Sequence, residues 1–144
     1  LDMIKMTADR LTELSPQPET VGIIASSAVL KAELYGKALE THGLDVVLPT
    51  VADQDAVMAL IKKVKSGQVS MADHQRFSDI ANCLVESGAQ AIAVACTDLS
   101  VMGQDGLICE VPLIDALDVL TEAIVTCVDR LVQSPVRDSI QGVQ

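Results

Sequence analysis

Val21-Gly22-Ile23-Ile24-Ala25, followed directly by Ser26-Ser27, is the stretch of sequence that decides the fold. A short run that is apolar at every position predicts a strand buried on both faces, which is the pattern of a parallel sheet. Ala91-Ile92-Ala93-Val94-Ala95 repeats this pattern and leads directly into Cys96-Thr97-Asp98. The sequence therefore predicts a parallel sheet whose buried strands end in small polar residues.

Helical segments separate the predicted strands. Apolar residues at helical spacing predict helices over residues 3–15 and 29–42, from Thr50 to Gly67, from Ser70 to Gly88 and over 117–131. Shorter apolar runs predict two further strands over residues 44–48 and 111–114. Strands that alternate with helices over short connections are typical of an α/β fold. We expect a parallel doubly wound three-layer α/β sheet, in which ligands bind at the carboxyl ends of the strands.

The composition excludes several classes of function. The 144 residues carry 10 Lys and Arg against 20 Asp and Glu, and the resulting net charge of −10 repels the phosphate backbone of nucleic acids. Tyr35 and Phe77 are the only aromatic residues, so the stacking platforms that bind bases are lacking. No apolar run approaches the ~20 residues of a membrane span. We expect a cytoplasmic protein with an aliphatic core and neither a nucleic-acid nor a membrane partner.

The cysteines indicate a reducing compartment and no metal site. Cys83, Cys96, Cys109 and Cys127 are separated by 13, 13 and 18 positions, which fits neither a paired zinc motif nor a dense disulfide framework. No Gly-rich phosphate loop occurs either. The sequence therefore predicts that the protein uses no metal and no cofactor.

The turn after the first buried strand is one candidate binding site. Ser26 and Ser27 offer two hydroxyls at the start of a helix, where free N–H groups and the helix dipole suit a carboxylate or a phosphate. The alternative is that Ser27 does no more than cap the helix.

The turn after the second buried strand is the candidate reactive site. Cys96 ends the strand, and a helical turn that begins at Thr97 and Asp98 favours the nucleophilic thiolate. The alternative is that Cys96 is a small buried apolar residue, as Cys often is. We assign that structural role to Cys83 and Cys127, which lie on or beside helical apolar stripes. Cys109 lies in a loop-like stretch and is assigned no role.

At Cys96-Thr97-Asp98 the chain resembles the aspartate/glutamate racemase superfamily, and most closely its aspartate racemase branch. The order and spacing of the matching segments are more specific than any one of them. The other segments are Leu1-Asp2-Met3-Ile4, Val21 to Ser27, Tyr35, Asp53-Gln54 to Met58, Val64-Lys65-Ser66-Gly67, Gly88-Ala89 and Val111-Pro112-Leu113-Ile114-Asp115.

The resemblance implies two similar α/β domains that face each other across a cleft, with one catalytic Cys from each and no cofactor. One thiolate removes the α-proton of the substrate, and the opposite thiol delivers a proton to the other face. The resemblance assigns Cys96 as the catalytic Cys of the second domain and Lys65 as a residue that holds a substrate carboxylate. The other expected site residues are Ser26, Ser27 and Thr97, which bind the substrate, and Asp98, which supports the site.

The chain also departs from the family pattern. Asp98 stands where the family usually has Glu, and Ala28-Val29 stands where it has Gly-Thr. The first-domain Cys, followed in the family by Asn-Thr, does not occur in the sequence. We therefore expect the carboxy-terminal part of a racemase that is inactive alone. The expected division is residues 1–15 as a strip of the missing first domain, 16–110 as the second domain with Cys96, 111–132 as a strand and helix that return to the first domain, and 133–144 as a flexible tail.

These observations predict an isomerase, a cofactor-independent racemase for aspartate or a similar acidic amino acid. Two alternatives stay open: another dicarboxylate isomerase or decarboxylase of the superfamily, and a non-catalytic domain that binds acidic ligands. We expect a small acidic amino acid as the bound partner and a homo-oligomeric assembly.

Overall fold

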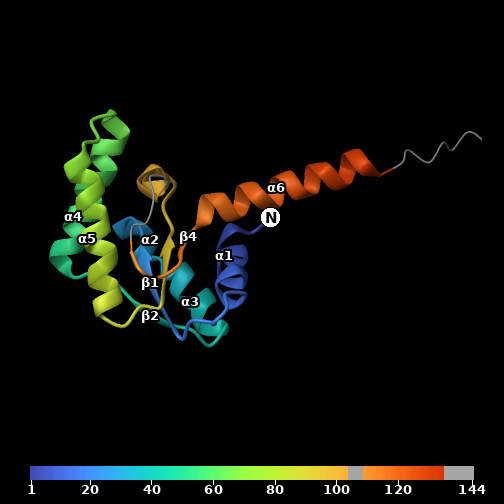
Figure 1. Cartoon of the computed structure of the whole chain (residues 1–144), viewed down its shortest axis with the longest axis horizontal. Coiled ribbons are helices and arrows are strands. Elements are labelled where there is room, and N and C mark those ends of the chain that lie inside the picture. Colours follow the sequence, from blue (N-terminus) through green and yellow to red (C-terminus); the bar gives the residue numbers. More distant parts are fainter. Residues whose placement is uncertain (104–108, 135–144) are drawn as a thin grey trace, which may run out of the picture.

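The computed structural model describes residues 1–103 and 109–134 of the chain. At its centre is a four-stranded parallel sheet in the order β2-β1-β3-β4 (Figure 1). The strands are β1 (Thr20–Ile24), β2 (Asp45–Val47), β3 (Ala91–Val94) and β4 (Leu113–Asp115). The two strands predicted to be buried, β1 and β3, pair in the middle of this sheet. The predicted α/β fold is confirmed.

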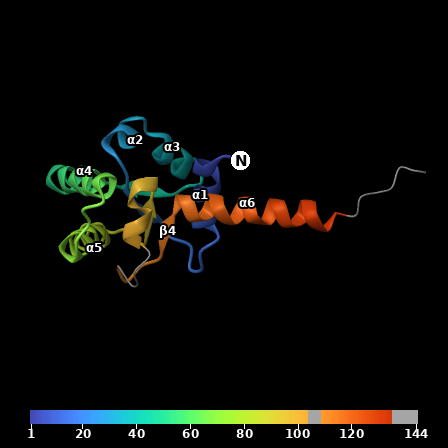
Figure 2. The ribbon, with the colours of Figure 1, turned by 90° about the horizontal axis from the view of Figure 1, so that it is seen from above.

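Helices cover both faces of the sheet and complete the three layers (Figure 2). α4 (Val51–Ser66) and α5 (Met71–Glu86) cover one face, and α1 (Met3–Thr12) and α3 (Leu34–Thr41) cover the other. Successive side chains of β1 alternate between these faces, because Ile24 packs with α4 and α5 while Ile23 packs with α1 and α3. Two covered faces explain why residues 21–24 of β1 and all of β3 are apolar.

The predicted helix over residues 29–42 is wrong as a single element. The structure has two helices there, α2 (Ser27–Lys31) and α3, and Glu33 between them has a left-handed backbone with φ of 53°. Apolar spacing continues across the break, so periodicity alone does not show it. Other boundaries are shorter or shifted: the first helix ends at Thr12, β2 covers residues 45–47, and β4 covers residues 113–115.

Two side chains outside α4, one from the residue before it and one from α5, bond to its first turn. Thr50 Oγ1 accepts a hydrogen bond from the backbone N–H of Asp53 at 3.2 Å, which makes Thr50 the N-cap of the helix. The Asp53 carboxylate does not complete a capping box, since it accepts from Arg76 on α5 at 2.9 Å. At the start of α5, by contrast, Ser70 and Asp73 form a capping box, in which each side chain bonds to the backbone N–H of the other residue. The bond between Asp53 and Arg76 therefore joins the first turn of α4 to α5.

Gly22 permits the close approach of α5 to the sheet. A Cβ at this position would lie 2.8 Å from Ile92 Cδ1 and 3.1 Å from Leu84 Cβ, which is closer than packed carbon atoms allow. The absence of a side chain at this one position of β1 therefore sets how tightly α5 packs.

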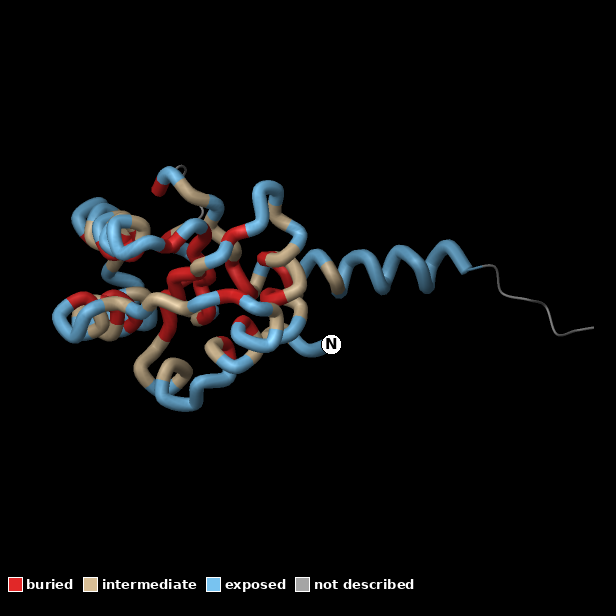
Figure 3. Tube along the Cα trace, turned by 90° about the horizontal axis from the view of Figure 1, so that it is seen from below, coloured by how far each residue is buried: buried red, intermediate tan, exposed pale blue. Residues whose placement is uncertain are grey.

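The last helix, α6 (Ala116–Gln133), extends away from the body of the molecule (Figure 1). Its start packs beside α1, where Arg10 pairs with Glu122. Beyond that contact the helix is exposed (Figure 3), and its exposed large apolar residues are Ile124, Val125, Val128, Leu131 and Val132. The assignment of residues 1–15 and 111–132 to contacts with another domain stays a prediction.

Two parts of the predicted division lie outside the described residues. They are residues 104–108 of the second domain and, beyond Ser134, most of the predicted tail over residues 133–144. Within the described ranges, no helix has the length and apolar composition that crossing a membrane requires.

Candidate active site

The two predicted turns lie next to each other at one edge of the sheet. In the parallel pair β1 and β3, Ile24 lies opposite Val94, and the Ala95 N–H donates to the Ile24 carbonyl at 2.9 Å. Ser26 and Cys96 each follow two residues after these partners, so both turns leave the sheet at its carboxyl edge. This is the edge at which open parallel sheets bind ligands.

The serine turn caps α2 through Ser26 and not through Ser27. Ser26 Oγ accepts from the backbone N–H of Val29 at 3.3 Å, and Ser27 is the first residue of the helix. The simple alternative raised by the sequence, in which Ser27 is the cap, is therefore wrong. Both serines are half-buried, and the Ser27 hydroxyl has a different partner from a different helix.

Cys96 is half-buried and connects β3 to a short 3-10 helix, η1 (Thr97–Gly103). The helical turn predicted at Thr97 is present, and the Leu99 N–H donates to the Cys96 carbonyl at 3.0 Å. Cys96 packs against the core under α4 and α5, while Thr97 is exposed. The thiol thus lies at a strand end beside a helix start.

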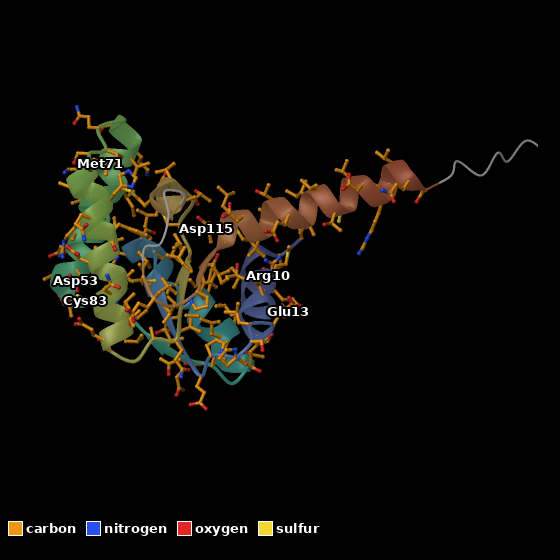
Figure 4. All side chains as sticks on the ribbon, in the orientation of Figure 1. Arg10, Glu13, Asp53, Met71, Cys83 and Asp115 are labelled. Carbon is orange, nitrogen blue, oxygen red and sulfur yellow. The ribbon has the colours of Figure 1, made fainter. Side chains whose placement is uncertain are left out.

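The other cysteines have different surroundings. Cys109 is buried, donates to the Val111 carbonyl at 3.4 Å, and has its pKa raised by burial, so it is poorly suited to act as a base. Cys83 and Cys127 were assigned to packed interiors, and this assignment is wrong because both are exposed. Cys83 lies on the solvent side of α5 (Figure 4), and Cys127 lies on the extended part of α6.

Lys65 reaches the cysteine turn from the last turn of α4. Its Nζ lies 3.6 Å from Asp98 Oδ2, and the two side chains are 65% and 36% exposed. This contact joins residues that are far apart in sequence, and it brings a cation next to Cys96-Thr97-Asp98. Both side chains therefore remain partly open to solvent.

Two polar residues, Asp115 and Tyr35, belong to the segments of the family resemblance, but were assigned no role at the site from the sequence. Asp115, labelled in Figure 4, caps α6. Its carboxylate accepts from the Leu117 N–H at 2.8 Å and from Ser100 Oγ at 3.0 Å. Burial raises the pKa of Asp115. Burial also raises the pKa of the Tyr35 hydroxyl, and negative charge at Asp115 or Cys96 raises it further. Asp115 lies opposite Val94 in the β3 and β4 pair, so its carboxyl group lies at the same edge of the sheet as Cys96.

Gln54 on the first turn of α4 was also missed as a site residue. Its Nε2 donates to the Ala25 carbonyl at 3.0 Å and to Ser27 Oγ at 3.2 Å. Only the resemblance named this residue, and no periodic pattern indicates that a side chain on α4 contacts the turn after β1.

A cavity of about 290 Å³ lies elsewhere, between the α2 and α3 pair and the strands β1 and β2. None of the predicted site residues lines it. The residues around it are Ile23, Val29, Leu30, Glu33, Tyr35, Gly36, Lys37, Glu40, Val46 and Leu48. In the part of the chain that the structure describes, no group of three or more His, Cys, Asp or Glu side chains is arranged to hold a metal ion.

Comparison with known proteins identifies the family. The family model described as Asp/Glu/Hydantoin racemase matches residues 1–124. The chain belongs to this racemase family. The resemblance found in the sequence is thus confirmed at the level of the family.

Individual similar proteins match part or most of this chain, and each is considerably longer than the matched region. An uncharacterized protein in the pnlA 3' region of Pectobacterium carotovorum subsp. carotovorum is 35% identical over 79 residues, which are 55% of this chain and 52% of that protein. A crystal structure from Yersinia pestis, assigned provisionally to the Asp/Glu racemases, has a TM-score of 0.76 at 21% identity, over 92% of this chain and 56% of that one. Picrophilus torridus aspartate racemase has a TM-score of 0.74 at 24% identity, over 90% and 52%. The chain spans about half the length of these relatives.

Proposed function

We propose that the chain supplies one half of the active site of a cofactor-independent racemase for aspartate or a similar acidic amino acid. Family membership over residues 1–124 supports the reaction class. The position of Cys96 at the carboxyl end of β3 supports its role as the reacting group. In this proposal Cys96 is catalytic, and the surrounding polar groups bind the substrate.

The chemistry requires acid–base groups on both faces of the α-carbon. In one direction the Cys96 thiolate takes the α-proton, and the electron pair left on carbon is delocalised into the neighbouring carboxylate. A thiol on the opposite face then gives its proton to the same carbon and becomes a thiolate, which inverts the centre. The reverse direction exchanges the two roles. We propose that the second thiol comes from a facing α/β domain, as the family resemblance implies, and that the 144-residue chain is inactive alone.

Substrate binding follows from the polar groups at the sheet edge. Ser26 and Ser27 contribute hydroxyls, Thr97 contributes a third, and Lys65 contributes a cation, which together balance carboxylates without a metal. Asp98 holds Lys65 near the cysteine turn when no substrate is bound. An incoming substrate carboxylate competes with Asp98 for the Lys65 ammonium group, and this exchange selects acidic substrates.

The observation that carries the proposal is the 3.6 Å contact between Lys65 Nζ and Asp98 Oδ2. It brings the expected carboxylate-binding cation to within two residues of the expected catalytic thiol. This contact connects Lys65 on α4 with the turn that follows Cys96 at the end of β3.

A racemisation assay with chiral separation of the products tests the proposal. The chain is assayed alone and when joined at its N-terminus to a first racemase domain, with D-aspartate and L-aspartate as substrates. We expect inversion by the joined form and none by the chain alone. L-glutamate and maleate are assayed in parallel, because conversion of maleate without inversion of either amino acid would replace the racemase by a dicarboxylate isomerase.

A further inference from the structure

Gln54 makes a forked contact with the turn after β1. Both hydrogens of a single carboxamide are used, because Nε2 donates to the Ala25 carbonyl at 3.0 Å and to Ser27 Oγ at 3.2 Å. The backbone N–H of Gln54 donates to the Thr50 carbonyl at 2.8 Å, so the side chain starts from a fixed point on the first turn of α4. The fork therefore sets the position of the turn relative to α4.

Met58 extends this contact by one helical turn. Its Sδ accepts from the backbone N–H of Ser27 at 3.3 Å, and residues 54 and 58 lie on the same face of α4. Ser27 is thus held by α4 at both its backbone nitrogen and its hydroxyl oxygen. These two contacts come from α4, and not from α2, the short helix that Ser27 begins.

The fork also decides which way the Ser27 hydroxyl can donate. A serine oxygen that accepts from Gln54 directs its own proton away from the Gln54 amide. That proton is then available to an acceptor that arrives at the sheet edge, such as a carboxylate oxygen.

The contact carries a stability cost. Gln54 Oε1 is buried and has no hydrogen-bond partner among the described residues. An acceptor buried without a donor is unfavourable, and an apolar side chain of similar length would avoid this loss. Packing alone therefore does not explain an amide at this position.

We propose that Gln54 is a positioning residue for the substrate-binding turn, acting through Ser27. It holds the Ser27 hydroxyl in a single orientation in which its proton points toward the substrate carboxylate. This proposal rests on the proposed function, in which the turn binds an acidic amino acid, and it adds the residue that orients the turn.

Gln90 provides a matched control, because its side chain contacts the opposite end of β1. Its Oε1 accepts from the backbone N–H of Glu19 at 2.6 Å and of Thr20 at 3.4 Å, so it holds the amino end of β1 as Gln54 holds the carboxyl end. Gln54→Met and Gln90→Met each remove one side-chain amide that bonds to an end of β1 or to the turn after it. Only Gln54→Met affects the end at which the proposed substrate site lies. Urea unfolding of both variants shows whether each remains folded.

The first readout is binding of succinate to the 144-residue chain, measured by calorimetry. We expect Gln54→Met to weaken binding about tenfold, the loss of one hydrogen bond to a charged group, and Gln90→Met to leave it within about twofold. In a Ser27→Ala background, Gln54→Met should cause no further loss, because the residue acts through Ser27. An equal loss in both backgrounds, or unchanged binding in Gln54→Met, would overturn the proposal.

The second readout needs no ligand. The three-bond couplings between Hα and Hβ of Ser27, measured by NMR, report whether its side chain occupies one rotamer. We expect one rotamer in the parent chain and in Gln90→Met, and averaged couplings in Gln54→Met. If the parent chain does not bind succinate, the proposed function fails for this chain, while these couplings still decide the role of Gln54. A single rotamer retained in Gln54→Met would contradict it.

Discussion

Lys65 Nζ at the end of α4 lies 3.6 Å from Asp98 Oδ2 in η1, and this contact joins the outer helix layer to the turn that carries Cys96. The two groups are partly open to solvent, so the pair contributes little to the stability of the fold. The contact places the Lys65 ammonium group at Asp98, two residues after Cys96, and in the proposed function this cation binds the substrate carboxylate.

Lys65→Met should therefore weaken succinate binding by about tenfold and leave the free energy of unfolding nearly unchanged. Lys62→Met, an exposed lysine one turn earlier on the same helix, is the control and should bind as the parent does. Asp98→Asn should tighten binding, because it removes the carboxylate that competes for Lys65. Calorimetry measures all three, and equal affinities for Lys65→Met and the parent would remove Lys65 from the site.

Alkylation of the cysteines should show that Cys96 is the thiol at the ligand site. Cys83 and Cys127 are more exposed and Cys109 is buried, so accessibility alone predicts that Cys96 reacts at an intermediate rate. We expect Cys96 to react first with iodoacetamide, ahead of the more exposed thiols, because the proposed function makes it the reacting group. Peptide mapping by mass spectrometry identifies the labelled residue. Succinate should slow labelling of Cys96 alone, and equal slowing at Cys83 would indicate a general effect on the fold.

Glu33→Gly should stabilise the protein. Glu33 holds a left-handed backbone with φ of 53°, which costs a residue with a side chain about 1 kcal/mol and costs glycine almost nothing. The greater freedom of glycine in the unfolded chain offsets part of this gain. Thermal or urea unfolding measures the change, and Lys37→Ala controls for the loss of the weak 3.9 Å ion pair with Glu33. A less stable Glu33→Gly variant would show that the Glu33 side chain contributes more to the free energy of unfolding than the left-handed backbone costs.

His42 should make the stability of the α1 and α3 contact depend on pH. Its Nδ1 lies 2.7 Å from the Ala38 carbonyl and its Nε2 lies 2.9 Å from Asp9 Oδ1, so both ring nitrogens meet acceptors and the imidazolium form is favoured. The bond to Ala38, and then the bond to Asp9, raise the pKa of His42 above 6.5. The stabilisation is therefore fully present below the unfolded pKa and is lost as pH rises through the higher folded pKa.

Urea unfolding of the parent and His42→Asn from pH 5 to 9 measures this effect. The stability difference between them should be largest at the acid end of the range and should shrink at the alkaline end. A difference that stays constant across the range would mean that the histidine ring contributes by packing alone.

The central sheet could be predicted because its signal is local. Residues 21–24 of β1 and all of β3 are apolar, which is the direct consequence of helices on both faces. Parallel order then brings the carboxyl ends of these strands to one edge, so the sequence places Ser26 and Cys96 at the same edge of the sheet. That β1 and β3 are adjacent strands is known only from the structure. Lys65 could be assigned only by family resemblance, because its place beside Asp98 depends on how α4 packs against η1.

Other features depend on contacts that leave no pattern in the sequence. The contact from Gln54 to Ser27 spans 27 positions and joins a helix to a turn, so neither periodicity nor capping rules indicate it. The break at Glu33 interrupts a stretch whose apolar spacing continues unchanged. Cys127 lies on an apolar stripe, but α6 extends beyond the sheet that would bury this stripe.

The measurement that tests the central claim most directly is transfer of the α-proton of aspartate in D2O, followed by NMR and chiral separation. The form joined to a first racemase domain is compared with its Cys96→Ser variant, starting separately from D-aspartate and L-aspartate. We predict that the parent produces the opposite enantiomer with one deuterium at the α-carbon, and that Cys96→Ser inverts aspartate at least about a hundredfold more slowly. Inversion by Cys96→Ser at the parental rate would show that Cys96 does not transfer the proton.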